Sequence, residues 1–506
     1  MTISKVAGVV STVAALLLAV APAEAQYARA SRSSQSGLRT LELERVWNTQ
    51  IQFDSTRGRL AGLTQHISAT KLQSIYVVTY PGGRIAFSQR DRDAFQRILG
   101  VDGAKKKAEQ WVADWRFRTK SKEPVEIIEE VVPDVTLVAT SQRGIVQCLD
   151  GETGRTEWTN KIGSVRHPTT TAGINDLYVA AVNGTTLYLL DRADGHVVWE
   201  RRTEHPAGGG PGLSDNLIFV PMINGHIEIF FVDDPNTPAA FFQSSGRCLQ
   251  QPVIFRDSVA WVTDNGNLYV GNSELAGVRF GVKANAPIPA PATFRAGKGK
   301  EPALLFYASS DGYVSAVETA KGKIVSRFST GDTISQSPLV VEDRVFIVTD
   351  SGSMFCSDAE TGEELWYASG IKSMLSADLK QVYCLDRDNR IVAIESDSGN
   401  RVGSASVGTI DYSFLNTQSD RIYVGTTTGT IECYRKSTQR YPLVHSAMDP
   451  QSLLPQVKQG DDAPEEKMPE KKKPAAGEDE NPFDLGEKPA VDKPVEAMED
   501  ENPFGE

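Results

Sequence analysis

Histidine and cysteine, the side chains that most often bind metals or carry redox chemistry, are few and widely spaced in this sequence. The residues are His66, His167, His196, His205, His226, His445, Cys148, Cys248, Cys356, Cys384 and Cys433. None of them forms a His-x-x-x-His, Glu-x-x-His, Cys-x-x-Cys or Cys-x-x-Cys-His pattern. The spacing therefore predicts no metal centre, no haem and no bound cofactor.

A different motif, Asp-x-x-x-Gly-x-x-x-Trp, has a fixed spacing and occurs three times in full. Its copies are Asp150, Gly154 and Trp158; Asp191, Gly195 and Trp199; and Asp358, Gly362 and Trp366. The carboxylate can accept hydrogen bonds from backbone N–H groups of a turn, and glycine can adopt its left-handed bend. The tryptophan then falls on the next strand, where its wide ring can wedge against a neighbouring sheet. We interpret the motif as structural.

The strands that carry this motif belong to a longer repeat of strand, tight turn and strand. Eight copies follow one another between residues 135 and 435, and each has a glycine or asparagine in its turn: Gly144, Gly184, Gly225, Gly266, Gly312, Gly352, Asn389 and Gly429. Pro168, Pro211, Pro252 and Pro338 each precede a short apolar segment that we expect to be the innermost strand of a copy. A period of about 40 residues with several strands per unit is typical of propeller blades. The prediction is a mainly β fold, an eight-bladed propeller of four-stranded antiparallel blades over residues 124–446.

The eight repeats and three tryptophan motifs resemble the tryptophan-docking pattern of the PQQ-like repeat family of eight-bladed propellers. That family includes quinoprotein alcohol dehydrogenases and the BamB proteins of outer-membrane β-barrel assembly. Five copies depart from the pattern, with Ser326 and Gly403 at two of the expected tryptophan positions. Those junctions between blades must be filled differently.

The resemblance implies two different functions. Catalytic members typically hold PQQ over the ring centre with a disulfide between adjacent cysteines, a Ca²⁺ ion and a catalytic aspartate. This chain has no adjacent cysteines, so we expect neither PQQ nor Ca²⁺ and predict that the protein is not an enzyme. The preferred interpretation is an exported scaffold that binds envelope proteins and resembles BamB, with a role in outer-membrane protein assembly. A PQQ-dependent oxidoreductase and a cell-surface propeller that binds glycans or polymers are the alternatives.

The charge of the chain is concentrated at one end. Of the net charge of −12, the 7 lysines and 17 acidic residues of 447–506 contribute −10. The remaining body is nearly neutral, which argues against nucleic acid as a partner. We expect this tail to be disordered. It contains EDENPF twice, and Phe483 and Phe504 are either anchors of a two-copy docking peptide or parts of an acidic spacer.

The first 25 residues have the layout of a signal peptide. Lys5 precedes an apolar run from Val6 to Val20, and Ala-Glu-Ala ends at residue 25. We therefore expect export to the periplasm or cell envelope, with no transmembrane span in the mature chain; an uncleaved anchor is the alternative. The first cysteine is Cys148, so a lipid anchor is not expected.

Residues 26–122 do not follow the repeat and predict a small α+β module. The segments VWNTQIQF, SIYVVTY and GRIAFSQ indicate strands, and residues 103–119 indicate an amphipathic helix. We expect Pro442 to His445 to supply the inner strand of the first blade, and Val125 to Val131 to lie at the outer edge of the last. The ring is expected to be monomeric.

Cys148, Cys356 and Cys433 occupy the same place in three copies, four residues after the turn glycine. Equivalent positions in neighbouring blades are generally too far apart for a disulfide. We predict buried, unpaired cysteines that pack as small hydrophobic residues.

Overall fold

The computed structural model describes residues 37–52, 59–81, 83–95, 97–120, 123–298, 301–439 and 441–445. The signal-like segment 1–25, the tail 447–506 and the two tail phenylalanines lie outside these residues.

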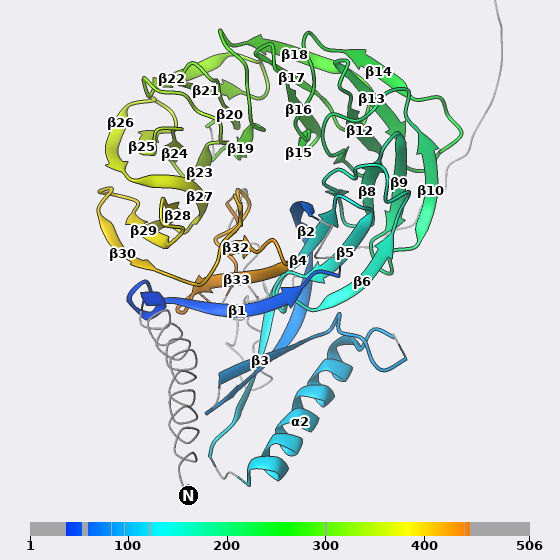
Figure 1. Cartoon of the computed structure of the whole chain (residues 1–506), viewed down its shortest axis with the longest axis vertical. Helices are drawn as coiled ribbons and strands as arrows, with labels where there is room; N and C mark the ends of the chain where they lie inside the picture. Colours follow the sequence, from blue (N-terminus) through cyan, green and yellow to red (C-terminus); the bar gives the residue numbers. More distant parts are fainter. Residues whose placement is uncertain are drawn as a thin grey trace, which may run out of the picture. The chain divides into compact units, whose positions relative to one another are not determined.

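Eight antiparallel sheets form a ring in the described part of the chain (Figure 1). From the inner to the outer edge, blade 1 contains β2 (Leu60–Tyr80), β4 (Glu126–Ser141), β5 (Ile145–Asp150) and β6 (Thr156–Lys161), and blade 2 contains β7 (Gly173–Ile174), β8 (Tyr178–Asn183), β9 (Thr186–Asp191) and β10 (Val197–Arg202). In the same order, blade 3 contains β11 (Gly212–Leu213), β12 (Leu217–Pro221), β13 (His226–Phe231) and β14 (Ala240–Gln243), and blade 4 contains β15 (Val253–Phe255), β16 (Ser258–Val262), β17 (Asn267–Asn272) and β18 (Val278–Lys283). Blade 5 contains β19 (Thr293–Arg295), β20 (Leu304–Ala308), β21 (Tyr313–Glu318) and β22 (Ile324–Ser329), and blade 6 contains β23 (Leu339–Val341), β24 (Arg344–Val348), β25 (Ser353–Asp358) and β26 (Glu364–Ser369). Blade 7 contains β27 (Ile371–Ala377), β28 (Gln381–Asp386), β29 (Ile391–Glu395) and β30 (Arg401–Ala405), and blade 8 contains β31 (Tyr412–Phe414), β32 (Ile422–Gly425), β33 (Thr430–Lys436) and β1 (Leu43–Gln50). The predicted eight-bladed propeller of four-stranded antiparallel blades is confirmed.

The burial of each strand follows its place in the blade. The second strands β12 and β16 are buried along their whole length because both faces pack against neighbouring blades. The outer strand β18 alternates between half-buried and exposed residues. One hydrophobic cluster fills each of the eight seams between blades. The core is therefore divided among the seams, which is why middle strands are apolar runs rather than alternating ones.

The tight turns use the residues that the repeat singled out. All seven turn glycines and Asn389 have positive φ, for example 90° at Gly144 and 56° at Asn389. A side chain with a Cβ branch would be strained in this conformation, whereas glycine and asparagine adopt it readily.

The N-terminal strands close the ring, which differs from the expected closure. Strand β1 pairs along its length with β33 and is the outer strand of blade 8, and the first half of β2 pairs with β4 as the inner strand of blade 1. Pro442 to His445 instead make one isolated bridge, Val444 to Ser419, and residues 126–131 pair with β2. The expected roles of Pro442–His445 and Val125–Val131 are therefore wrong. The inner edge of blade 1 is already occupied by the first half of β2, whose pairing with β4 from Leu60 to Ile67 is a longer hydrogen-bond ladder than the four residues Pro442–His445 can form.

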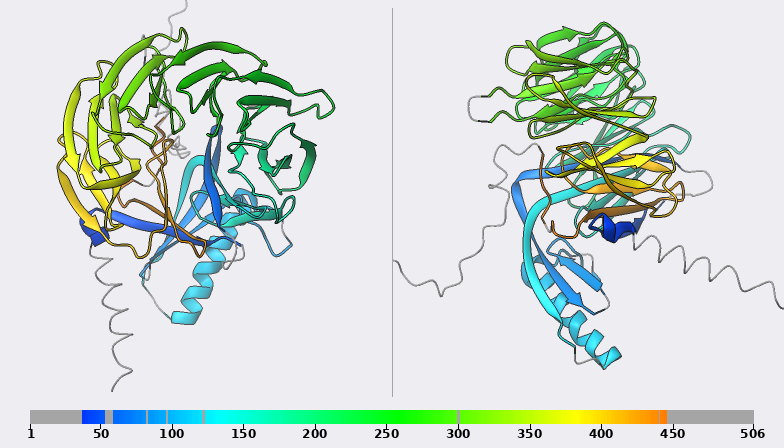
Figure 2. Two further views of the ribbon diagram at one scale, coloured as in Figure 1. Left: turned by 45° about the horizontal axis from the view of Figure 1, so that its top comes forward. Right: turned by 90° about the vertical axis from the view of Figure 1, so that its left-hand side faces the viewer.

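The two strands β2 and β4 continue beyond the ring and carry an insertion, residues 68–134. Pairing resumes after a register shift between Ile67 and Leu72, and β3 (Gly83–Ser88) adds a third strand through a hairpin in which Tyr80 faces Gly83. Helix α2 (Gly100–Thr119) follows. The strands, hairpin and helix predicted between residues 74 and 119 are confirmed, but they extend the inner hairpin of blade 1 (Figure 2).

Helix α2 covers one face of the three-stranded part of the insertion. Ala104, Ala108 and Val112 recur every four residues and pack on Tyr76, Val78 and Phe87. The opposite face holds Ile75, Val77 and Val132, with Tyr441 packed against it. The insertion therefore has its own small core.

Candidate functional site

Ion pairs fix the base of the insertion against blades 1 and 2. Arg90 forms salt bridges with Asp134 and with Glu157 on β6, the latter at 2.6 Å. Asp134 also pairs with Arg192 of blade 2. Burial by itself lowers the pKa of Arg90, but Glu157 and Asp134 outweigh burial and raise it. Arg90 therefore stays charged and holds the insertion against two blades.

Asp176, in the turn between β7 and β8, extends this contact. Its carboxylate hydrogen-bonds with His66 Nε2 at 2.7 Å and accepts a hydrogen bond from the Ser68 hydroxyl at 3.0 Å. The hydrogen bond with His66, followed by the charge of His66 and the bond from Ser68, lowers the pKa of Asp176 to about 2. The carboxylate therefore remains ionised in all but strongly acidic solution.

A cavity of about 320 Å³ lies beside blades 6 and 7, and a second of about 220 Å³ lies at the base of the insertion. The second is lined by Arg90, Asp91, Arg92, Asp93, Lys107, Asp150, Arg155, Thr156 and Glu157. Arg155 pairs with Asp91 and lies over the ring of Phe87, with its guanidinium carbon 4.9 Å from the ring centroid. Because these charges of opposite sign pair with one another, the arrangement can position the insertion against blade 1.

The insertion also exposes large apolar side chains. Phe117 near the end of α2 is 85% exposed, Phe95 in the loop before α2 is 78% exposed, and Ile98 and Val101 are exposed as well. Exposed apolar side chains on a projecting element are typical of a surface that contacts another molecule. The insertion is therefore the candidate partner surface.

The motif tryptophans lie at the seams between blades. The indole N–H groups of Trp158, Trp199 and Trp366 donate to backbone carbonyls of the following blade, at 2.6, 2.9 and 2.8 Å. The motif glycine of one blade makes room for the tryptophan of the preceding blade: a Cβ on Gly195 would lie 2.3 Å from the ring of Trp158. The motif of blade 2 thus receives the ring of Trp158 and supplies that of Trp199 to blade 3, whereas Gly362 of the third motif faces Ser326.

The motif aspartates cap their turns. Asp150 Oδ1 accepts hydrogen bonds from the backbone N–H groups of Glu152 and Thr153, both at 2.9 Å. Asp358 and Asp191 accept equivalent bonds from the residues that follow them. Gly154, Gly195 and Gly362 all have positive φ.

Sequence reasoning missed a fourth docking tryptophan, Trp47 on β1. Its indole N–H donates to the carbonyl oxygen of Gly151 at 2.9 Å, and a Cβ on Gly154 would lie 2.3 Å from its ring. Gly154 therefore receives Trp47. This contact could not be recognised in the sequence because β1 comes before blade 1 in the chain, whereas the other three strands of blade 8 come after blade 7.

The seam between blades 8 and 1 also contains a buried ion pair that the sequence did not indicate. Arg421 is fully buried and donates to both carboxylate oxygens of Glu152, at 3.1 and 3.0 Å, and to Asp420 at 3.1 Å. Burial raises the pKa of Asp420 to about 6, although Arg421 opposes the rise. This cluster joins the two ends of the repeat.

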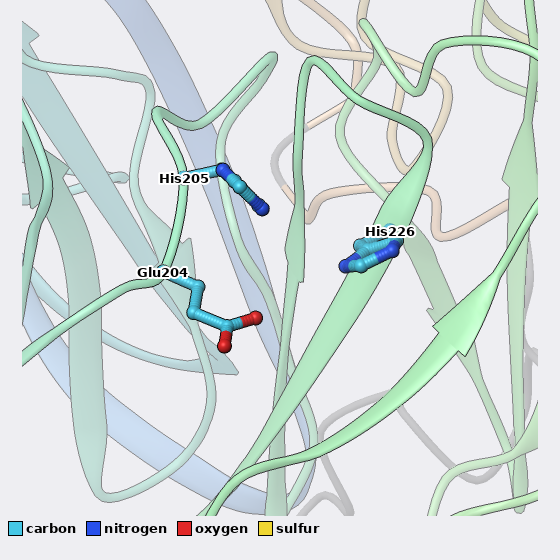
Figure 3. A group of neighbouring side chains, drawn as sticks. All are labelled: Glu204, His205 and His226. Carbon is cyan, nitrogen blue, oxygen red and sulfur yellow. The ribbon is translucent and has the colours of Figure 1, made fainter.

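One cluster has the composition of a metal site. Ligand atoms of Glu204, His205 and His226 all lie within 4.8 Å of one another (Figure 3). A second set, Asp191, Asp194 and His196, lies in the turn before β10. There Asp191 caps the turn, and His196 Nδ1 is 2.6 Å from Asp194. Glu204, His205 and His226 have no metal-binding spacing in the sequence, because they come from two different blades.

All five cysteines are buried and free, and the predicted burial is confirmed. Burial raises the pKa of the Cys248 thiol to about 11 and that of Cys356 to about 12. The described helices include none that is both long and apolar enough to cross a membrane.

Comparison with known proteins gives the family. Residues 95–221, 142–278 and 310–429, about three-fifths of the chain, match the family model described as outer membrane protein assembly factor BamB. The chain belongs to this family of BamB-like PQQ-repeat propellers. The predicted family resemblance is therefore confirmed.

The individual proteins and solved structures to which the chain is similar share little sequence with it. The outer membrane protein assembly factor BamB of Yersinia pestis is 23% identical over 296 residues, which cover 54% of this chain and 64% of that protein. The crystal structure of BamB from Moraxella catarrhalis is 16% identical with a TM-score of 0.49, over 59% of this chain and 91% of the other. The C-terminal WD40 domain of Sif2 is 12% identical with a TM-score of 0.46, over 59% and 92% of the two chains.

Proposed function

We propose that this protein is a non-enzymatic scaffold of the cell envelope that binds envelope proteins during outer-membrane protein assembly. The observation that carries the proposal is the BamB family match over about three-fifths of the chain. The signal-like segment 1–25 supports a periplasmic location.

The non-enzymatic part of the proposal is supported by the state of the reactive groups. The thiols are buried, and burial raises the pKa of Cys356 to about 12, so that this thiol is neutral and a poor nucleophile at neutral pH. The motif tryptophans and aspartates are engaged in seams and turns. Arg90 and Arg155 at the base of the insertion are paired with carboxylates. These groups hold the molecule together.

We further propose that the insertion contributes the partner contact. It projects from the ring through two long strands, and ion pairs at its base fix it to blades 1 and 2. Its exposed Phe95 and Phe117 would be buried by a bound protein. A rigid support reduces the entropy lost on binding, so an exposed apolar surface on such a support is suited to stable association.

Cross-linking in envelope fractions followed by affinity purification tests both parts. The matched variants are Phe95→Ser with Phe117→Ser on the insertion, and Leu275→Ser, which removes a 70% exposed side chain from blade 4. The wild type and Leu275→Ser are expected to recover a barrel-assembly protein, and the double variant is expected to recover several-fold less.

The two proposals fail differently. If the wild-type protein recovers no barrel-assembly protein, the proposed function is wrong. If all three proteins recover it equally, the function stands and the insertion is not the contact surface.

A further inference from the structure

The seam between blades 2 and 3 brings together side chains that the scaffold role does not use. Glu204 and His205 follow β10 in the link to blade 3, and His226 is the first residue of β13. Figure 3 shows the carboxylate of Glu204 and the ring of His205 pointing toward the side of the link where His226 lies. All three offer ligand atoms within 4.8 Å of one another. We propose that Glu204, His205 and His226 bind one zinc ion that joins blades 2 and 3.

The link that carries two of these residues is held in place. The backbone N–H of Glu204 donates to Glu228 Oε1 at 3.0 Å, and the carbonyl oxygen of His205 accepts a hydrogen bond from the Thr203 hydroxyl at 2.7 Å. Glu228 is itself buried on β13. The backbone is therefore positioned before any ion binds, which lowers the entropy lost on binding.

His226 is oriented for coordination. Its ring stacks on Phe241 with centroids 5.1 Å apart and an interplanar angle of 19°, and the ring of His205 meets it edge-on at 5.7 Å. Stacking uses the faces of the imidazole, whereas a metal binds the lone pair in its plane, so the two are compatible. Nδ1 of His226 is buried and has no hydrogen-bond partner among the described residues. This nitrogen is thus available to a ligand.

The donor set selects the kind of ion. Two imidazoles and one carboxylate are the ligands of zinc sites with an open fourth position, whereas Mg²⁺ and Ca²⁺ prefer oxygen ligands alone. Tetrahedral zinc needs donor atoms about 3.3 Å apart, so small rotations must bring the present groups closer. Glu204 is exposed and His205 is half-buried, which leaves room for these rotations and leaves the fourth position open to solvent.

The repeat does not produce this set at the neighbouring seam. In the link between blades 1 and 2, Arg166 and His167 precede a proline and occupy the positions that Glu204 and His205 have in the next link. Thr186, the first residue of β9, occupies the position that His226 has in β13. That seam offers one imidazole beside a cationic side chain. His167 therefore provides a matched control for His205.

Isothermal titration of the metal-free full-length protein with ZnCl₂ tests the site. Wild type and His167→Ala are expected to bind one zinc ion per chain tightly. Weak binding of zinc by the acidic residues of 447–506 would be the same in all variants and is subtracted as a common background. His205→Ala and His226→Ala are expected to weaken this site by at least about tenfold. MgCl₂ is expected to leave the site empty. Zinc should also raise the melting temperature of wild type and His167→Ala and leave the two ligand variants unchanged.

Glu204→Gln provides a ligand variant that can be compared even where a histidine variant does not fold, because Glu204 is exposed. It is also expected to weaken zinc binding. Absence of a stoichiometric zinc site in the wild type would overturn the proposal, and so would zinc affinity in the ligand variants equal to that of His167→Ala. In either case, the two histidines and Phe241 form only an aromatic contact.

Discussion

At the scale of single residues, tryptophans join one blade to the next. Trp47, Trp158 and Trp366 are buried and donate an indole hydrogen bond across a seam, and a glycine on the receiving blade leaves space for the ring. Where tryptophan is missing, other side chains occupy the position: Phe280 lies against Gly322, and Ser326 faces Gly362. The same backbone geometry therefore accepts side chains of different size, from tryptophan to serine.

Replacement of Trp47 by alanine is expected to be strongly destabilising. The side chain is 7% exposed, and truncating a buried tryptophan typically lowers the free energy of unfolding by about 3–5 kcal/mol. Trp199→Ala should lower it less, because Trp199 is only partly buried. Urea denaturation of both variants measures the difference. Equal losses would mean that burial at the seam does not set the contribution of these rings.

At the scale of elements, the insertion depends on the blades that anchor it. Strands β2 and β4 are shared by blade 1 and the insertion, and His66 on β2 reaches across to Asp176 of blade 2. Arg90 and Arg192 share Asp134 between them. The insertion is thus attached both through covalently continuous strands and through side chains of two blades.

The contact of Asp176 with His66 and Ser68 predicts that the stability of the folded protein depends on pH. Because the pKa of Asp176 is lowered to about 2 in the folded protein from about 3.9 in an unfolded chain, ionisation stabilises the fold above about pH 4. This contribution is lost as the pH falls from about 4 to 2. Wild type should therefore lose more stability than Asp176→Asn over this range, and the two proteins should converge at pH 2.

The measurement is the melting temperature as a function of pH. Asp233→Asn is the control, since Asp233 is exposed and makes no ion pair among the described residues. It should follow the wild type at every pH. Parallel curves for wild type and Asp176→Asn would contradict the assignment.

At the scale of the whole molecule, the ring is closed by strands from both ends of the repeat. Blade 8 combines β31, β32 and β33 with β1, and β2 begins blade 1. Trp47 and the Arg421–Glu152 pair cross the seam where the ends meet. Closure therefore depends on contacts between distant parts of the chain. Trp47 and Gly151 are 104 positions apart, and Arg421 and Glu152 are 269 positions apart.

Arg421→Met is expected to weaken this closure. It leaves Glu152 and Asp420 buried without their cation, and removal of one partner of a buried pair costs about 3–5 kcal/mol. Adding Glu152→Gln should recover part of the loss, because one uncompensated charge is removed. Chemical denaturation of the single and double variants checks this. A single variant as stable as wild type would show that the pair does not hold the seam.

The repeat, turn residues and propeller fold could be predicted because each depends on residues close together in the sequence. A positive φ at Gly144 and an apolar run in β16 are local requirements of a tight turn and of a strand buried on both faces. The helix α2 was visible for the same reason, since Ala104, Ala108 and Val112 recur at helical spacing.

The contacts between distant segments were decided only by the tertiary structure. The similarity of YPLVH to an inner strand suggested a closing segment, but β1 and β2 offered longer ladders and a tryptophan that fits Gly154. Likewise Glu204, His205 and His226 have no metal-binding spacing, because the fold brings together the end of one blade and the third strand of the next. Short-range periodicity determines the blades, whereas packing free energy summed over the closed ring determines which ends and side chains meet.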